Sequence, residues 1–134
     1  MKNLIFAFAA IFLFTLHAHA QQNSCIVKDG NGASVTITVV QTYDDGKVDL
    51  SVSSDCNDFV NVNYTLTYRM YYYNEPKGNR QIIQRTETSQ PFNVLAQPQS
   101  STSIPVKINL KPIGELVKWE VEKININGAR CENK

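Results

Sequence analysis

The longest amphipathic pattern in the chain runs from Phe59 to Tyr73, where apolar and polar residues alternate strictly. The even positions from Val60 to Tyr72 are Val, Val, Tyr, Leu, Tyr, Met and Tyr, and the odd positions include Asn, Asn, Thr, Thr and Arg. Because successive side chains of a β-strand point to opposite faces, this pattern predicts one long strand with an apolar face and a polar face. At about 3.3 Å per residue it would run roughly 45 to 50 Å, so we expect it to bend or to carry a bulge.

Shorter segments with the same two-residue period predict the remaining strands. Turn signals separate them. The clearest are Asp44-Asp45-Gly46, which suits a hairpin because Asp-Gly tolerates positive φ, and the loop at 74–79. The predicted strands cover residues 33–40, 47–52, 80–88 with a continuation at 92–94, 103–110 and 117–126.

Two of these segments carry features of edge strands. In 80–88 the neighbours Ile82 and Ile83 fall on opposite faces, which suits an edge strand or a bulged one. Pro105 has no backbone N–H to give to a ladder, so the strand at 103–110 is expected to begin at an edge of its sheet.

The last predicted strand changes parity part of the way along. Trp119 shares the inward parity of Val117 and Val121, which predicts a core tryptophan. From Ile124 onward the apolar residues have the opposite parity, so we expect a bulge or a break near Lys123.

The whole pattern is that of an all-β protein. No segment keeps the 3.6-residue period of a helix for three turns. Seven or eight strands, with turn signals roughly every 8 to 15 residues, predict an antiparallel β-sandwich.

The order of the segments resembles the bacterial immunoglobulin-like sandwiches of the FxLyD kind. A valine-rich strand that ends near Cys56 carries the resemblance, followed by VNVNYTLTYRMYYYN, EPKGN, SSTSIPVKINL and KWEVEKI, over roughly residues 47–124. The curli-assembly chaperones of the periplasm are similar in outline. The resemblance implies an antiparallel immunoglobulin-like β-sandwich that serves as a binding or accessory module.

The first twenty residues have the composition of a secretory signal peptide. Lys2 is followed by an apolar run at 4–16, and Ala18-His19-Ala20 fits the small-x-small cleavage pattern. The apolar run is too short to span a bilayer comfortably. We therefore predict a cleaved signal at 1–20, one β-sandwich domain at 21–134 with no membrane span, and export to the periplasm or the medium.

Removal of the signal would leave a chain with balanced charge and no histidine. Of 13 basic residues only Lys2 is lost, which leaves 12 basic and 12 acidic residues, and this balance gives no basic surplus for nucleic acid. Both histidines, His17 and His19, lie in the signal. The sequence therefore excludes His-dependent nucleophiles and His-based metal sites from the mature protein, and it predicts no cofactor and no metal.

The mature chain would hold three cysteines, Cys25, Cys56 and Cys131, and an oxidising compartment favours one disulfide with one thiol left over. In the immunoglobulin-like order that the resemblance implies, the strand ending at Cys56 and the strand ending near Ile126 run in the same direction, so their ends meet at one pole. This order favours a Cys56–Cys131 bond. Cys25–Cys131 is the alternative, because N- and C-terminal strands often lie next to each other.

The candidate binding residues lie where the polar face of the long strand becomes aromatic and basic. Tyr71 and Tyr73 have outward parity beside the 74–79 loop, with Arg69 and Arg80 close to them in the sequence. Tyr and Arg are enriched at interface hot spots because they bury a large area and keep a polar group. The sequence predicts a partner-binding patch here; the alternative is a twisted strand end covered by its own loop.

Carboxylates offer the only candidate catalytic groups. Glu120 and Glu122 share one strand face, with Cα atoms about 7 Å apart, a spacing that could serve a glycosidase. An exposed face shared with Lys118 is the more ordinary interpretation. The sequence therefore favours an exported non-enzymatic module that binds a protein or a surface polymer. The alternatives are a periplasmic assembly chaperone or aggregation inhibitor that uses an exposed strand edge such as 80–88, and a carboxylate-based hydrolase.

Overall fold

The computed structural model describes residues 21–28, 30–73 and 81–132. Within these ranges the chain forms eight β-strands and no helix, so the all-β prediction is confirmed. The strands are β1 (Gln22–Ile26), β2 (Ser34–Thr42), β3 (Lys47–Ser54), β4 (Val60–Tyr73), β5 (Ile82–Thr88), β6 (Phe92–Ala96), β7 (Ser100–Lys107) and β8 (Glu115–Cys131).

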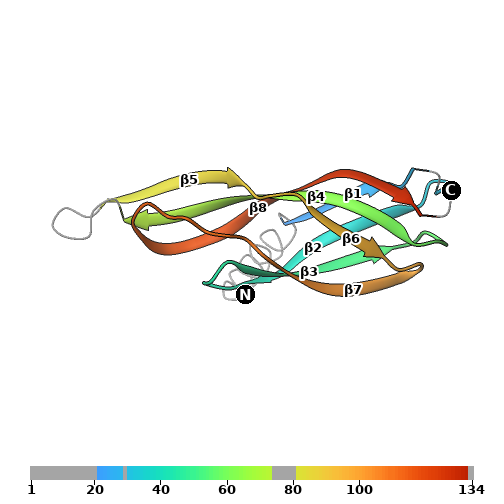
Figure 1. The fold of residues 1–134 in the computed structure, drawn as a ribbon, viewed down its shortest axis with the longest axis horizontal. Helices are drawn as coiled ribbons and strands as arrows, with labels where there is room; N and C mark the ends of the chain where they lie inside the picture. The colour runs from blue at the N-terminus through green and yellow to red at the C-terminus, as the bar shows by residue number, and fades with distance from the viewer. Residues whose placement is uncertain (1–20, 29, 74–80, 133–134) are drawn as a thin grey trace, which may run out of the picture.

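The strands form two antiparallel sheets, as a β-sandwich requires (Figure 1). Sheet A has the order β1-β2-β3-β7. Sheet B is centred on β4, which pairs with β8 along one side and with β5 and then β6 along the other. The neighbours β2-β3-β7 and β4-β8 correspond to the A-B-E and C-F strands of an immunoglobulin-type sandwich, and within the described residues no strand occupies the place of strand G.

The ribbon of β4 and β8 is the longest element of the fold, and its bulges lie on β8. The register runs from Val60 opposite Cys131 to Tyr73 opposite Glu115, and it shifts three times. Each shift leaves one residue of β8 without an opposite residue on β4, and these residues are five apart: Val117, Glu122 and Asn127. Bulges increase the right-handed twist of a ribbon, which lets two long strands remain paired over their whole length.

The bulges also decide which residues of β8 face the core. Because each bulge shifts the alternation by one residue, the inward residues are spaced alternately three and two apart: Leu116, Trp119, Val121, Ile124, Ile126, Ala129 and Cys131. The predicted break near Lys123 is confirmed, as is the buried Trp119. The inward prediction for Val117 was wrong, because Val117 is the extra residue of a bulge and is 43% exposed.

β5 and β6 pair with successive parts of β4, and the pairing is interrupted between them. Pro91 has no backbone N–H, and the ladder is continued by Ser89 instead. The Ser89 N–H donates to the Leu66 carbonyl at 2.8 Å, and the Ser89 Oγ accepts from the Leu66 N–H at 2.9 Å. A side-chain hydroxyl therefore replaces one backbone acceptor, and Phe92 resumes pairing opposite Tyr64, as the predicted continuation required.

The edge predictions are confirmed. In the described residues β5 has a ladder partner only on its β4 side, and β7, which contains Pro105, has one only on its β3 side. The predicted hairpin turn is also present, with Gly46 at a φ of +96°. A Cβ on Gly46 would lie 2.1 Å from the Ile108 carbonyl oxygen, so glycine is required there by the close approach as well as by φ.

The molecule is elongated and has two unlike halves (Figure 1). In the first, the sandwich half, Val60–Leu66 of β4 and the C-terminal half of β8 lie over sheet A. In the second, the arm, β5 with Thr67–Tyr73 and the N-terminal half of β8 projects beyond sheet A. Residues 108–114 cross the inward face of the arm: Ile108 is buried, and Gly114 lies so close to the Tyr73 carbonyl oxygen that a Cβ would be 1.9 Å from it.

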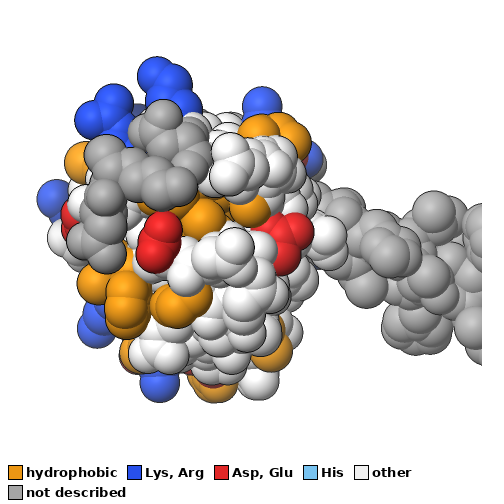
Figure 2. Space-filling model, turned by 90° about the vertical axis from the view of Figure 1, so that its right-hand side faces the viewer, with side chains coloured by type: hydrophobic (Ala, Val, Ile, Leu, Met, Phe, Trp, Pro, Cys, Tyr) orange, Lys and Arg blue, Asp and Glu red, His pale blue; other side chains and the backbone are white. Residues whose placement is uncertain are grey.

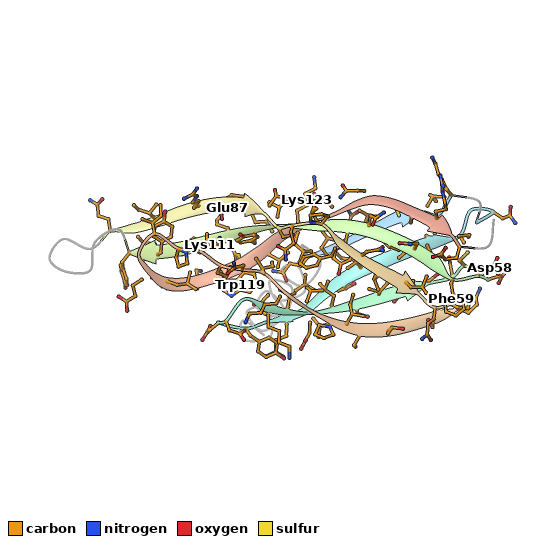
Figure 3. All side chains as sticks on the ribbon, in the orientation of Figure 1. Asp58, Phe59, Glu87, Lys111, Trp119 and Lys123 are labelled. Carbon is orange, nitrogen blue, oxygen red and sulfur yellow. The ribbon has the colours of Figure 1, made fainter. Side chains whose placement is uncertain are left out.

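Trp119 joins the arm to sheet A. Its Nε1 donates to the carbonyl of Tyr43, in the β2–β3 hairpin, at 2.7 Å, and its ring makes an edge-to-face contact with Tyr68. Figure 3 shows Trp119 on β8, where the arm meets the sandwich half.

Candidate binding surface

The structure places Arg69, Tyr71 and Tyr73 on the outward face of sheet B within the arm, as the parity of β4 predicted, and each is half-buried. Arg80 lies outside the described residues. Tyr71 stands opposite Gln84 on one side and Lys118 on the other, and Tyr73 stands opposite Ile82 and Glu115.

Arg69 is held by its neighbours on both flanking strands. It forms an ion pair with Glu122 on β8, and its Nε donates to the Thr86 Oγ1 on β5 at 3.3 Å. The pKa of Arg69 is raised above its ordinary value, mainly by a hydrogen bond with Tyr71. Desolvation lowers this pKa, and the negative charge of Glu122 raises it. Arg69 thus links three strands across this face.

Tyr71 is fixed in a similar way. Its hydroxyl donates to the Glu120 Oε1 at 3.0 Å, and the Lys118 Nζ lies 4.6 Å from the centre of its ring, within the range of a cation–π contact. Glu120 and Glu122, the candidate glycosidase pair, are therefore engaged by Tyr71 and by Arg69. Among the described residues, no group of three His, Cys, Asp or Glu side chains could hold a metal ion.

Two exposed aliphatic residues flank the tyrosines. Ile82, directly opposite Tyr73, is 56% exposed, and Val117, in the bulge beside Lys118, is 43% exposed. We call Tyr71, Tyr73, Ile82, Val117 and Lys118 the arm patch. Sequence reasoning missed Val117 because strict alternation places it inside; a bulge signal near 117 would have been needed to place it outside.

The open edge of β5 lies beside the arm patch. Its seven residues pair with β4 without a register shift, from Thr67 opposite Thr88 to Tyr73 opposite Ile82. It contains no proline and no lysine. Its two charged residues, Arg85 and Glu87, form an ion pair with each other at 3.1 Å. Figure 3 shows Glu87 on this strand.

The other long edges of the sandwich, β7 and β8, have features that disfavour pairing with a further strand. β7 contains Pro105 and ends at Lys107. β8 has its three bulges, its Ile124 carbonyl accepts from the Asn23 side-chain amide at 2.6 Å, and its end pairs with Lys28 in an isolated bridge. Of these three edges, β5 is the one without a bulge, a proline or a covering segment in the described residues.

A groove lies at the opposite pole, where β8 ends and β4 begins. It has a volume of about 710 Å³ and is lined by residues of β4, the end of β8, and the end of β1 with the chain that follows it. Lys28 and Arg130 contribute basic groups, and Asn61 contributes a buried Oδ1 that has no hydrogen-bond partner among the described residues. Figure 2 shows this pole end-on, with Lys and Arg side chains along its upper edge. No local pattern predicts this groove, because three segments that are distant in the sequence form it.

The cysteines meet at the same pole, but no disulfide joins them in the structure. The predicted Cys56–Cys131 bond is thus not formed in this structure, in which the two sulfur atoms are 3.1 Å apart, whereas a disulfide requires about 2.05 Å. Both residues are buried. Cys25 is half-buried on β1 opposite Val35, and burial raises the pKa of its thiol.

No helix in the described part of the chain is long and apolar enough to cross a membrane.

No protein-family model and no curated protein matches the sequence. Among solved structures, the chain is similar to an uncharacterised lipoprotein, YajI, of Escherichia coli, with 20% identity over 79% of this chain and a TM-score of 0.37; it spans 62% of that protein's length. It is also similar to the trimeric lipoprotein SadB of Salmonella enterica, with 12% identity over 98% of this chain and 71% of the other, and a TM-score of 0.35. With TM-scores this low, neither likeness assigns a family or a function.

Proposed function

We propose that the protein is an exported, non-enzymatic β-sandwich that binds a partner, a protein or a surface polymer, through the arm patch. The observation that carries this proposal is the position of Tyr71 and Tyr73 between two exposed aliphatic side chains, Ile82 and Val117, on one face of sheet B. Aromatic anchors beside apolar area and surrounded by charged groups are the usual composition of a protein-binding hot spot, so the patch favours a protein partner.

The surroundings of the carboxylates support a non-enzymatic role. A glycosidase needs one carboxyl group that stays protonated to act as an acid, and a hydrophobic surrounding usually provides this. Here Glu122 forms an ion pair with the guanidinium of Arg69, and Glu120 accepts a hydrogen bond from Tyr71 beside Lys118, so both carboxyl groups have polar partners in place of a hydrophobic surrounding. The predicted mature chain also lacks histidine.

Val117→Asp is the sharpest test of the arm patch. The side chain is exposed in a bulge, so a carboxylate there should leave the fold intact while placing a charge in the interface. We expect the variant to lose more than tenfold in affinity for the partners that wild type captures from an envelope extract, measured on the purified partner by surface plasmon resonance. Tyr71→Ala with Tyr73→Ala should abolish binding.

Asn63→Ala is the matched control. Asn63 is exposed on the same face of β4 but lies in the sandwich half, away from the arm patch. The Asn63→Ala variant should capture the same partners as wild type, with the same affinities. If Val117→Asp and the double tyrosine variant bind as wild type does while remaining folded by circular dichroism, the arm patch is not the binding surface.

A specific observation favours a second function, that of a chaperone or aggregation inhibitor acting through β5. An extended client segment could add as a strand to this unbulged edge and gain main-chain hydrogen bonds. Gln84→Pro and Arg85→Pro separate this mode from patch binding. Because neighbouring N–H groups of a strand point to opposite sides, one variant removes a donor to β4 and the other removes a donor on the open edge.

For this second function, the wild-type protein should delay amyloid formation by a client in a thioflavin assay. The proline variant that keeps the wild-type melting temperature should lose this delay, whereas Val117→Asp should keep it. Equal delay by wild type and both proline variants would exclude strand addition at β5.

A further inference from the structure

Cys56 and Cys131 are placed as partners by two different parts of the fold. Cys56 follows β3 of sheet A, and Cys131 is the last residue of β8 in sheet B, directly opposite Val60. Their sulfur atoms are 3.1 Å apart, closer than two non-bonded sulfur atoms normally lie, and both side chains are at most 3% exposed. About 1 Å of approach separates this geometry from a disulfide.

The backbone around both cysteines is already fixed. The Cys56 N–H donates to the Ser54 Oγ at 3.2 Å, and its carbonyl accepts from Gln99 at 3.0 Å. On the other side, the Cys131 N–H donates to the Lys28 carbonyl, and the next residue, Glu132, donates to the Phe59 carbonyl at 2.9 Å. Because these hydrogen bonds hold the backbone on both sides, we expect the sulfurs to reach bonding distance by small side-chain rotations.

We propose that Cys56 and Cys131 form a disulfide in the exported protein, and that this bond fastens sheet A to sheet B at the pole. Each thiol loses one proton and one electron. The two electrons and two protons reduce a disulfide oxidant, either the oxidised form of a thiol–disulfide oxidoreductase or oxidised glutathione, to two thiols. The bond joins positions 75 residues apart in the sequence and so connects the β3–β4 junction with the end of the last strand.

The geometry assigns Cys25 as the remaining thiol. It lies on β1 and lines the groove, whereas Cys56 is already in contact with Cys131. The raised pKa of the Cys25 thiol also lowers its thiolate fraction at neutral pH, which slows its attack on a disulfide. Of the two pairings that the sequence left open, the structure therefore favours Cys56–Cys131.

Peptide mapping of the full chain tests the proposal directly. The reduced protein is incubated with oxidised glutathione, alkylated with iodoacetamide and digested with trypsin without reduction. Cleavage after Lys47, Arg69 and Arg130 places Cys56 in peptide 48–69 and Cys131 in peptide 131–134, while Cys25 lies in a third peptide that ends at Lys28. We expect peptides 48–69 and 131–134 to be cross-linked, with alkylation confined to Cys25.

Two variants complete the test. Cys25→Ser should keep the cross-link and the wild-type loss of two hydrogen masses on oxidation, and Cys56→Ser should lose both. A cross-link to the peptide that ends at Lys28 would overturn the assignment. So would three alkylated cysteines in the folded protein, provided that the same oxidant forms disulfides when the chain is unfolded in urea.

Discussion

The sandwich half and the arm bury the inward face of the same strand in different ways. In the sandwich half, the inward residues of β4 are aliphatic except for Tyr64, and a second sheet covers them; the aliphatic ones are Val60, Val62 and Leu66. In the arm, which sheet A does not cover, the inward side chains are larger, and the irregular segment 108–114 crosses over them (Figure 1). They are Tyr68, Met70, Tyr72 and Trp119.

The change of residue type follows from the change of cover. Small branched side chains fill the space between two sheets well, but they would leave a sheet without a second layer exposed to water. Large aromatic side chains bury more area themselves and place their polar ends at the rim. In the arm the Tyr68 hydroxyl donates to Glu87, and the Trp119 indole donates to Tyr43. A single-layered arm with exposed edges is also the part of the molecule most suited to contact a partner.

Leu66→Ala and Met70→Ala compare the two covers directly. Both side chains are fully buried. We expect Leu66→Ala to lower the free energy of unfolding by about 3 to 4 kcal/mol, because two facing sheets cannot collapse into the cavity, and Met70→Ala by about 2 to 3 kcal/mol, because residues 108–114 can move inward. Urea denaturation measures both. Equal losses would show that the loop covers the arm as rigidly as sheet A covers the sandwich half.

Gly114→Ala tests how closely segment 108–114 packs against the arm. A Cβ there would lie 1.9 Å from the backbone oxygen of Tyr73, so the loop must shift, and we expect a loss of about 2 kcal/mol. Gly128→Ala is the matched control in the sandwich half, since nothing lies within 4 Å of the added Cβ. It should change the free energy of unfolding by no more than about 0.5 kcal/mol. A Gly114 variant as stable as the control would contradict this close seating.

Tyr64→Phe is expected to have the smallest effect at neutral pH. The Tyr64 hydroxyl is buried without a hydrogen-bond partner among the described residues, so its removal should leave stability unchanged or slightly raised. Burial raises the pKa of Tyr64 to about 12, above its ordinary value of 10.0. The unfolded chain therefore ionises first, and this contribution to stability is complete below pH 10 and falls as the pH rises from 10 to about 12. The phenylalanine variant should lose less stability over that window in urea titrations. A loss of stability at pH 7 would reveal a hydrogen bond at this hydroxyl.

If the disulfide forms, it should stabilise the sandwich half more than any single side chain considered above. The chain-entropy argument gives about 4.5 kcal/mol for a loop that joins positions 75 residues apart. Its effect would also be confined to the pole, far from the arm patch, so partner binding by the folded protein should not depend on the redox state.

Much of the architecture could be read from local pattern. Alternation from Val60 to Tyr72 determined the long strand and its buried face, Asp45-Gly46 determined the hairpin turn, and Pro105 marked an edge strand. These features depend on side-chain period and backbone chemistry, which the chain carries in neighbouring residues. The polar positions of Arg69 and Tyr71 on β4 followed from the same period.

Other features depend on residues that meet only in the folded chain. β1 has little apolar pattern of its own, and it forms because its backbone pairs with that of β2. The bulge that turns Val117 outward arises from pairing a strand of 17 residues with one of 14, and the partners that hold Arg69 and Tyr71 come from that register. Likewise, the sequence left two pairings open for Cys131, and the packing of sheet A on sheet B brought Cys56 to it. Local sequence fixes which way a side chain points along a strand, but register and packing between distant strands determine what it meets.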